Sequence, residues 1–136
     1  MIDLTDVQIF KDLTYIETEE AGFDIHNDYS CIQTSFDATD NTLKFSFQSS
    51  KDSILKYRLE LIFQNIKIEK FDLLWERNED SGTLNNFYRG KFEIQNSLVE
   101  FLDTGERFFY IEFEMGDKFE ISAKKAFFSF QAIVEK

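Results

Sequence analysis

The residues from 107 to 134 carry an apolar side chain at almost every second position, and this pattern constrains the fold more than any other feature of the chain. Successive side chains of a β-strand point to opposite faces, so a period of two is typical of a strand that buries one face. Three runs share the period, FFYIEF at 108–113, FEISA at 119–123 and AFFSFQAIV at 126–134. The segment therefore predicts consecutive antiparallel strands.

The turn between the first two runs decides which residues face each other. A two-residue loop would set Phe113 opposite Glu120, because a slip of one residue turns every side chain to the other face. A three-residue loop at 115–117 keeps apolar residues opposite apolar ones. It predicts the pairs Phe113–Phe119, Ile111–Ile121, Glu114–Lys118 and Glu112–Glu120, with Phe113 and Ile121 buried and Glu112 and Ser122 exposed.

The same period recurs in most of the upstream chain. Residues 55–63 alternate most regularly and predict a strand with one apolar face. A change of parity at Glu69–Lys70 predicts a β-bulge or a break, because an extra residue shifts the alternation by one. A four-residue loop at 38–41 predicts a hairpin with the pairs Phe36–Leu43 and Ile32–Phe47.

The remaining segments give shorter signals. Residues 98–102 predict a short strand in which Phe101 faces Phe109. Residues 3–13 have apolar side chains at helical spacing after Asp3, which is a plausible N-cap, so they predict a short helix. Residues 88–94 predict a further strand. In it, Tyr88, Gly90, Phe92 and Ile94 alternate with Arg89, Lys91 and Glu93.

Together these segments predict a mainly β domain that spans residues 1–136. We expect an antiparallel meander of about eight short strands that forms a sandwich or a partly open barrel, with a short N-terminal helix. A chain of 136 residues is long enough to bury one core.

The charge balance bears on the kind of partner. The net charge is -11, from 26 acidic and 15 basic residues, which disfavours attraction to nucleic acid or to an anionic membrane. A basic protein partner suits this charge. The 17 phenylalanines separate the chain from acidic disordered proteins, which are poor in aromatic residues.

The sequence also suggests a compartment. Residues 1–4 are MIDL, with no apolar core of the kind found in a signal peptide, and no run approaches the roughly 20 apolar residues of a membrane span. The single Cys31 cannot form an internal disulfide, which agrees with a reducing environment. A cytoplasmic location is therefore expected.

Two arrangements could carry chemistry. If residues 24–28 are extended, Asp24, His26 and Asp28 project from one face and could offer two carboxylates and an imidazole to a divalent metal. Directly opposed Glu112 and Glu120 could hold different pKa values, as in a hydrolase. The blander interpretation is that both groups are ordinary surface side chains, and we expect no catalytic residue, no metal and no cofactor.

Two further residue classes have a structural and a functional interpretation. Cys31 has no basic neighbour to lower its pKa, so a buried or half-buried thiol is expected rather than a nucleophile. The phenylalanine-rich faces are expected to form the core, although a barrel lined with them could carry an apolar ligand. The polar face of the 107–123 hairpin is the expected protein-binding surface, with an aromatic anchor among acids: Tyr110, Glu112, Glu114, Asp117 and Glu120.

Four segments in order carry a family resemblance: FDIHNDYS at 23–30, TLKFSF at 42–47, LELIFQNI at 59–66 and FYIEFEMGDKF at 109–119. In these strand patterns the chain resembles the immunity protein 50-like family, acidic antidotes of bacterial polymorphic toxins. The resemblance covers most of the chain after residue 22. It implies a cytosolic protein that binds and neutralises a toxin and that has no catalytic activity. The rival functions are a metal-dependent enzyme and an apolar-ligand carrier.

Overall fold

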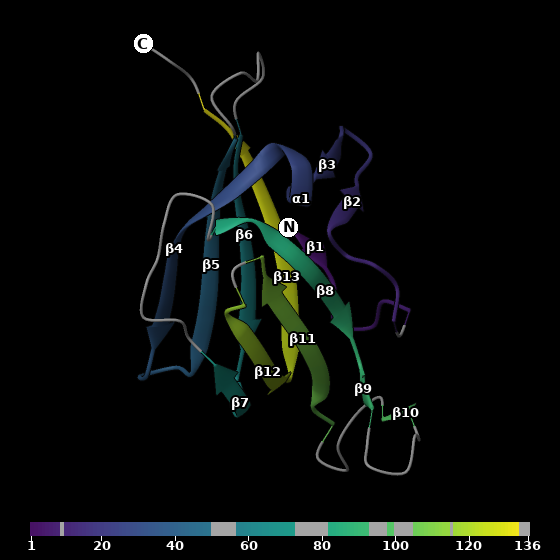
Figure 1. Cartoon of the computed structure of the whole chain (residues 1–136), viewed down its shortest axis with the longest axis vertical. Coiled ribbons are helices and arrows are strands. Elements are labelled where there is room, and N and C mark those ends of the chain that lie inside the picture. Colours follow the sequence, from purple (N-terminus) through teal and green to yellow (C-terminus); the bar gives the residue numbers. More distant parts are fainter. Residues whose placement is uncertain are drawn as a thin grey trace.

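A computed structural model describes residues 1–8, 10–49, 57–72, 82–92, 98–99, 105–114 and 116–133 (Figure 1). The elements are β1 (Ile2–Asp3), β2 (Tyr15–Glu17), β3 (Gly22–Asp24), α1 (Ile25–Asp28), β4 (Tyr29–Asp37), β5 (Thr42–Ser49), β6 (Tyr57–Gln64), β7 (Lys67–Asp72), β8 (Leu84–Arg89), β9 (Lys91–Phe92), β10 (Leu98–Val99), β11 (Arg107–Phe113), β12 (Lys118–Ala123) and β13 (Lys125–Ala132). The prediction of a mainly β, antiparallel chain is confirmed.

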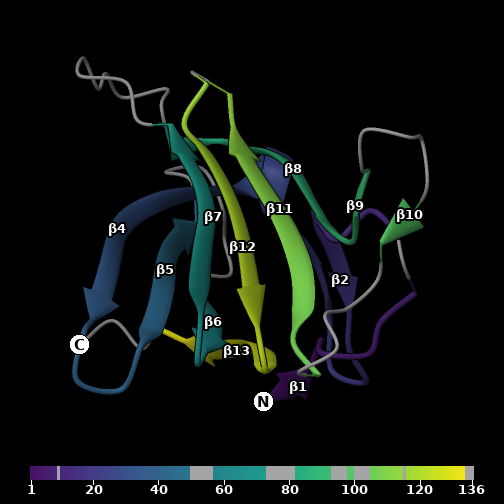
Figure 2. The ribbon, with the colours of Figure 1, turned by 90° about the horizontal axis from the view of Figure 1, so that it is seen from below.

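Two sheets make up most of the fold. One has the strand order β1-β13-β6-β5-β4 and the other has the order β7-β12-β11-β8. The four-stranded sheet lies in front of the five-stranded sheet in Figure 1, and the two layers are seen from below in Figure 2. Two small sheets, β9 with β10 and β2 with β3, complete the described strands. The arrangement is a sandwich of antiparallel sheets and not a closed barrel.

One bent two-stranded ribbon belongs to both sheets, so the strands do not follow the predicted meander. Strand β6 pairs with β13 in one sheet, while their direct neighbours in sequence, β7 and β12, pair in the other. The ribbon bends at Asn65, which has a positive φ of 53°, and at Lys124, whose amide donates to Gln64 at 3.1 Å. Asparagine tolerates this left-handed conformation better than most residues. The run at 126–134 therefore leaves the hairpin before it and crosses to the opposite sheet.

Phenylalanine rings from the two sheets meet in the core. Phe45 of β5 lies 5.6 Å from Phe113 and 5.0 Å from Phe119, measured between ring centroids. Phe63 of β6 lies 5.3 Å from Phe109 of β11. These rings are almost fully buried. Alternation along β5, β6, β11 and β12 puts these rings on inner faces, as the sequence pattern predicted.

The predicted register of the β11–β12 hairpin is wrong by two residues. Ile111 pairs with Phe119, and Glu112 pairs with Lys118. The turn lies one residue earlier than expected, since the Phe113 amide donates to the Asp117 carbonyl at 2.9 Å and Gly116 between them has a φ of 100°. A slip of two residues leaves every side chain on its own face. The predicted burial of Phe113 and Ile121 is therefore confirmed even though their partners differ.

The expected exposure of Ser122 is also wrong. Ser122 is fully buried, and its hydroxyl donates to the Glu106 carboxylate at 3.2 Å. Glu106 is itself only 4% exposed and lies 3.7 Å from the ammonium of Lys67. The outward face of the sheet is thus covered at this end, which the alternation of β12 alone does not reveal.

Two further predictions of strand pairing have different outcomes. The pair Phe36–Leu43 is confirmed, but the pair Ile32–Phe47 is wrong, because a bulge at Ile32 sets Cys31 opposite Phe47 and leaves Ile32 50% exposed. The bulge predicted at Glu69–Lys70 is confirmed, because Ile68 pairs with Ile121 and Lys70 with Glu120, which leaves Glu69 as the extra residue.

The predicted helix at residues 3–13 is wrong. Residues 2–3 form strand β1, and the following segment sends its backbone bonds to β8: the amide of Phe10 donates to Arg89 and that of Leu13 to Phe87. These bonds to β8 replace those of a helix. The described helix, α1, has four residues, and within the described ranges no helix is long and apolar enough to cross a membrane. The predicted pair Phe101–Phe109 and the positions of Leu55 and Ile94 lie outside the described residues.

Candidate functional site

The outer face of the four-stranded sheet carries a row of polar and aromatic side chains. Tyr110 on β11 stands between Tyr88 on β8 and Glu120 on β12, because each is its direct partner in the strand register. The rings of Tyr88 and Tyr110 stack with centroids 5.0 Å apart and planes inclined by 19°. Phe10 of the N-terminal segment packs against Tyr88, with ring centroids 5.3 Å apart and planes inclined by 58°. Adjacent strands thus hold an aromatic stack beside a carboxylate.

The Glu112 carboxylate is the centre of a hydrogen-bond network on the same face. One oxygen accepts from the Tyr110 hydroxyl at 2.9 Å and lies 3.5 Å from the Lys118 ammonium. The other accepts from the side-chain amides of Asn86 at 2.7 Å and of Asn85 at 3.5 Å. Glu112 is therefore half-buried rather than exposed as predicted, and its charge is compensated within the chain.

A bulge in β8 explains how two consecutive asparagines reach one carboxylate. Glu112 pairs with Asn86 and the next residue, Phe113, pairs with Leu84, so Asn85 is the extra residue. In a regular strand these neighbours would point to opposite faces, whereas a bulge lets both lie on one side. Both amides can therefore donate to Glu112.

The network alters the acidity of its members. Desolvation by burial acts to raise the pKa of the Glu112 carboxyl, but the hydrogen bonds from Asn86, Tyr110 and Asn85, with the charge of Lys118, lower it overall. Burial, followed by the hydrogen bond to Glu112, raises the pKa of the Tyr110 hydroxyl. The pKa of Tyr88 is raised by burial and by the negative charges of Glu120 and Glu112.

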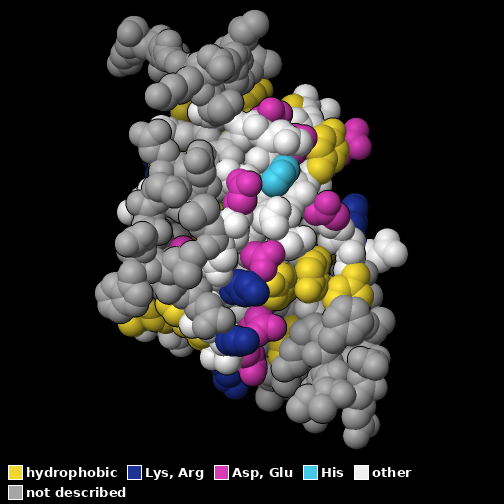
Figure 3. Space-filling model, viewed as in Figure 1, with side chains coloured by type: hydrophobic (Ala, Val, Ile, Leu, Met, Phe, Trp, Pro, Cys, Tyr) yellow, Lys and Arg dark blue, Asp and Glu magenta, His cyan; other side chains and the backbone are white. Residues whose placement is uncertain are grey.

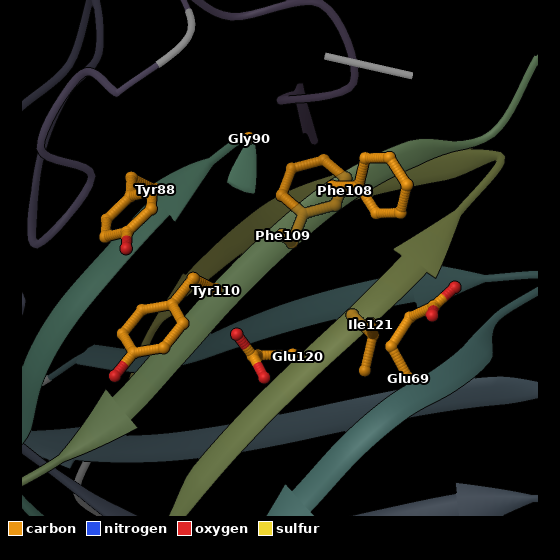
Figure 4. Close-up of a pocket in the computed structure, with 8 residues that line it drawn as sticks. All are labelled: Glu69, Tyr88, Gly90, Phe108, Phe109, Tyr110, Glu120 and Ile121. Atoms are coloured by element: carbon orange, nitrogen blue, oxygen red, sulfur yellow. The ribbon is translucent and has the colours of Figure 1, made fainter. Parts of the chain in front are cut away.

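Beside the stack lies a cavity of about 130 Å³ (Figure 4). It is lined by Glu69, Tyr88, Gly90, Phe108, Phe109, Tyr110, Glu120 and Ile121. Gly90 follows β8 opposite Phe108, and its amide donates to the Phe108 carbonyl at 2.8 Å. Gly90 therefore lines the cavity with its backbone alone.

Two carboxylates border this cavity. Glu69 is the extra residue of the β7 bulge, and such bulges redirect a side chain away from its regular face. Glu120 is half-buried beside Tyr110, and its carboxylate forms no hydrogen bond or ion pair with any residue that the structure describes. Figure 4 shows Glu120 from β12 between Tyr110 and Ile121, with Glu69 on the neighbouring strand.

The predicted binding residues are brought together only in part. Tyr110, Glu112 and Glu120 share the outer face, and Glu114 is exposed in the turn after β11. Asp117 was expected at an exposed tip but is buried, with 5% of its surface exposed. Figure 3 shows carboxylates alternating with basic side chains down the middle of this face, beside a band of hydrophobic side chains.

Four contributors to the site were not predicted from the sequence. The alternation placed Tyr88 with Phe92 on one face and Arg89 on the other, whereas Arg89 is buried and Tyr88 lies on the outer face. The partners of Glu112, namely Asn85, Asn86 and Lys118, were not expected either. The apolar pattern of β11 does not reveal the register slip that brings Lys118 opposite Glu112. It also does not reveal the bulge in β8 that brings both asparagines to the same carboxylate.

The residues considered for metal binding have a different geometry from the one expected. Residues 25–28 form α1 and are not extended, and the Asp24 carboxylate accepts from the backbone and side-chain amides of Asn27. The His26 Nδ1 atom lies 2.8 Å from the Leu84 carbonyl oxygen. Among the residues that the structure describes, no group of three or more His, Cys, Asp and Glu side chains could hold a metal ion.

The other chemical candidates are placed as follows. Glu112 and Glu120 are not directly opposed, because Lys118 and Tyr110 are their partners across the hairpin. Cys31 is half-buried, as expected, and lies 3.9 Å from the Thr34 hydroxyl. Phenylalanine rings fill the space between the sheets, where an apolar ligand would have to lie. Compared with known proteins, the chain matches no family model, no curated protein and no solved structure.

Proposed function

We propose that this chain is a small acidic binding protein that sequesters a basic protein partner through the outer face of its four-stranded sheet. The observation that carries the proposal is the Glu120 carboxylate beside the Tyr88–Tyr110 stack, without an ion-pair partner among the described residues. A charged group in this position is available to a basic side chain of another protein. The net charge of -11 would speed the encounter with such a partner.

The partner in this proposal is a toxin, and the chain is its cytoplasmic antidote. This part is supported by the resemblance to the immunity protein 50-like family and by the acidic surface. An antidote acts by binding alone, so the proposal includes no catalytic residue and no cofactor. Tyr110 and Glu120 supply the contacts, Glu114 adds charge at the turn, and Glu112 holds Tyr110 in place.

The first experiment is affinity capture from a lysate of the source organism. The tagged wild-type chain is compared with Glu120→Lys, which reverses the available charge, and with Glu19→Lys, which makes the same change at an exposed loop position outside this face. We expect a basic protein that wild type and Glu19→Lys retain at low salt and that Glu120→Lys loses. Retention should fall at about 0.5 M salt, where charges are screened within a few ångströms.

The second experiment tests neutralisation. The captured protein is expressed alone and then together with wild type or Glu120→Lys. The proposal expects arrested growth alone, recovery with wild type and no recovery with the variant. If the partner is harmless by itself, the antidote function is wrong; if Glu120→Lys captures it as well as wild type does, this face is not the binding surface.

A further inference from the structure

The cavity on the outer face has the chemistry of a site for one organic cation. From its composition we infer that it receives the guanidinium group of an arginine side chain presented by the partner. The inference rests on the proposed function and adds the chemical identity of the group that the partner inserts.

Aromatic rings form one side of the cavity. Tyr88, Tyr110 and Phe108 all line it; Tyr88 stacks on Tyr110 and also contacts the tilted ring of Phe10. The electron-rich face of an aromatic ring attracts a cation within about 6 Å of its centroid. Because backbone pairing and stacking fix these side chains, little conformational entropy is lost when a ligand binds.

Carboxylates form the opposite side. Glu120 projects from β12 and Glu69 from the bulge of β7, with the side chain of Ile121 between them in Figure 4. No described residue forms a hydrogen bond or ion pair with either carboxylate. Lys70 pairs with Glu120 in the register, but it does not line this cavity. A cation entering between the rings and these acids would supply the missing counter-charge.

Shape favours arginine over lysine. A guanidinium group is planar, so it can stack on a tyrosine ring while its edge donates to a carboxylate, whereas an ammonium group is compact and strongly hydrated. The cavity of about 130 Å³ is small, and guanidinium has only four heavy atoms. The cavity has room for the head of one side chain and not for a folded peptide.

The test uses a small probe and needs no partner. Nα-acetyl-arginine amide is titrated into the isotope-labelled wild-type protein, and the backbone amide shifts are followed by NMR. Nα-acetyl-lysine amide tests the preference for guanidinium, and Nα-acetyl-citrulline amide, which has the same shape without the charge, tests the need for a cation. We expect shifts at Phe108, Tyr110 and Glu120, binding of the arginine probe at least about fivefold tighter than the lysine probe, and no binding of citrulline.

Variants then locate the site. Glu120→Gln should weaken binding of the arginine probe about tenfold, as should Glu69→Gln, because each removes a charge-assisted contact. Glu19→Gln removes the same charge at an exposed loop position outside this face and should bind like wild type. Glu69 is exposed on an edge strand, so its variant should fold even if changes at Glu120 disturb the sheet.

Each result bears on the inference separately from the proposed function. Equal binding of lysine and arginine probes, or binding that survives both Glu120→Gln and Glu69→Gln, overturns the assignment of the cavity. A captured basic partner with no arginine binding would also overturn it and would leave the proposed function standing. Arginine binding without any captured partner would support the cavity and contradict the proposed function.

Discussion

Tyr110 donates its hydroxyl hydrogen to Glu112, two residues further along the same strand, at 2.9 Å. The bond ties the aromatic member of the face to the carboxylate that Asn86 and Lys118 also hold. Glu112 therefore positions Tyr110, whereas Glu120 across the hairpin keeps its charge available to a partner. Two acids on one face thus have separate roles.

The Glu112 network predicts a pH-dependent stability. The folded pKa of Glu112 lies below its ordinary value of 4.5, so the ionised form stabilises the folded state at higher pH. This contribution should be complete above about 4.5 and should disappear as the pH falls through the lower folded pKa. Glu112→Gln should cost about 1 kcal/mol at neutral pH, since hydrogen bonds to a charged group are lost. Urea unfolding from neutral to acidic pH should show the gap between the two proteins closing, while Glu114→Gln should follow wild type throughout.

The tyrosines predict a late alkaline titration. Burial raises the pKa of Tyr29 to about 12, and burial also raises the pKa of Tyr88 and Tyr110 above the ordinary value of 10.0. Since the unfolded chain ionises first, stability should fall as the pH rises from about 10 towards 12. Phenolate absorbance should show part of the titration above pH 10, and Tyr110→Phe should remove one hydroxyl from that late part. A single titration at the ordinary value for all five tyrosines would contradict these environments.

Phenylalanine truncation should distinguish core from edge. Phe45 is fully buried between Phe63, Phe113 and Phe119, so Phe45→Ala should lower the free energy of unfolding by about 3–5 kcal/mol. Phe36→Ala makes the same change on strand β4 where the ring is 49% exposed, and it should cost about 1 kcal/mol or less. Denaturant midpoints measure both, and similar losses at the two positions would contradict the sandwich.

The buried hydroxyl of Ser122 should contribute to the free energy of unfolding. Ser122 donates to Glu106, and both residues are buried, so Ser122→Ala would leave a carboxylate oxygen without this donor. We expect a loss of about 1–2 kcal/mol in unfolding free energy. Ser129→Ala on the half-buried face of β13 is the matched change and should stay within about 0.5 kcal/mol. Thermal or urea unfolding of the two variants decides whether the Ser122–Glu106 contact stabilises the fold.

The sequence by itself determined which side chains face inward along most strands. Alternation is a local property, and it correctly assigned Phe113 and Ile121 to the core and identified the bulge at Glu69 from a change of parity. It did not determine which residues meet across the hairpin. A two-residue slip leaves the alternation unchanged, so the pairing of Glu112 with Lys118 depends on where the turn lies, which the Phe113–Asp117 bond fixes.

Only the tertiary structure decided how the strands combine and what the outer face offers. The bend at Asn65 and Lys124 distributes one ribbon between two sheets, a choice that the apolar pattern of β6 and β13 leaves open. The backbone amides of Phe10 and Leu13 donate to carbonyls of β8. This pairing takes the place of the helix that the apolar spacing at 3–13 predicts. Tyr88 on β8 joins Tyr110 and Glu120 of the β11–β12 hairpin, and the side-chain period along β11 does not reveal that β8 is its other neighbour.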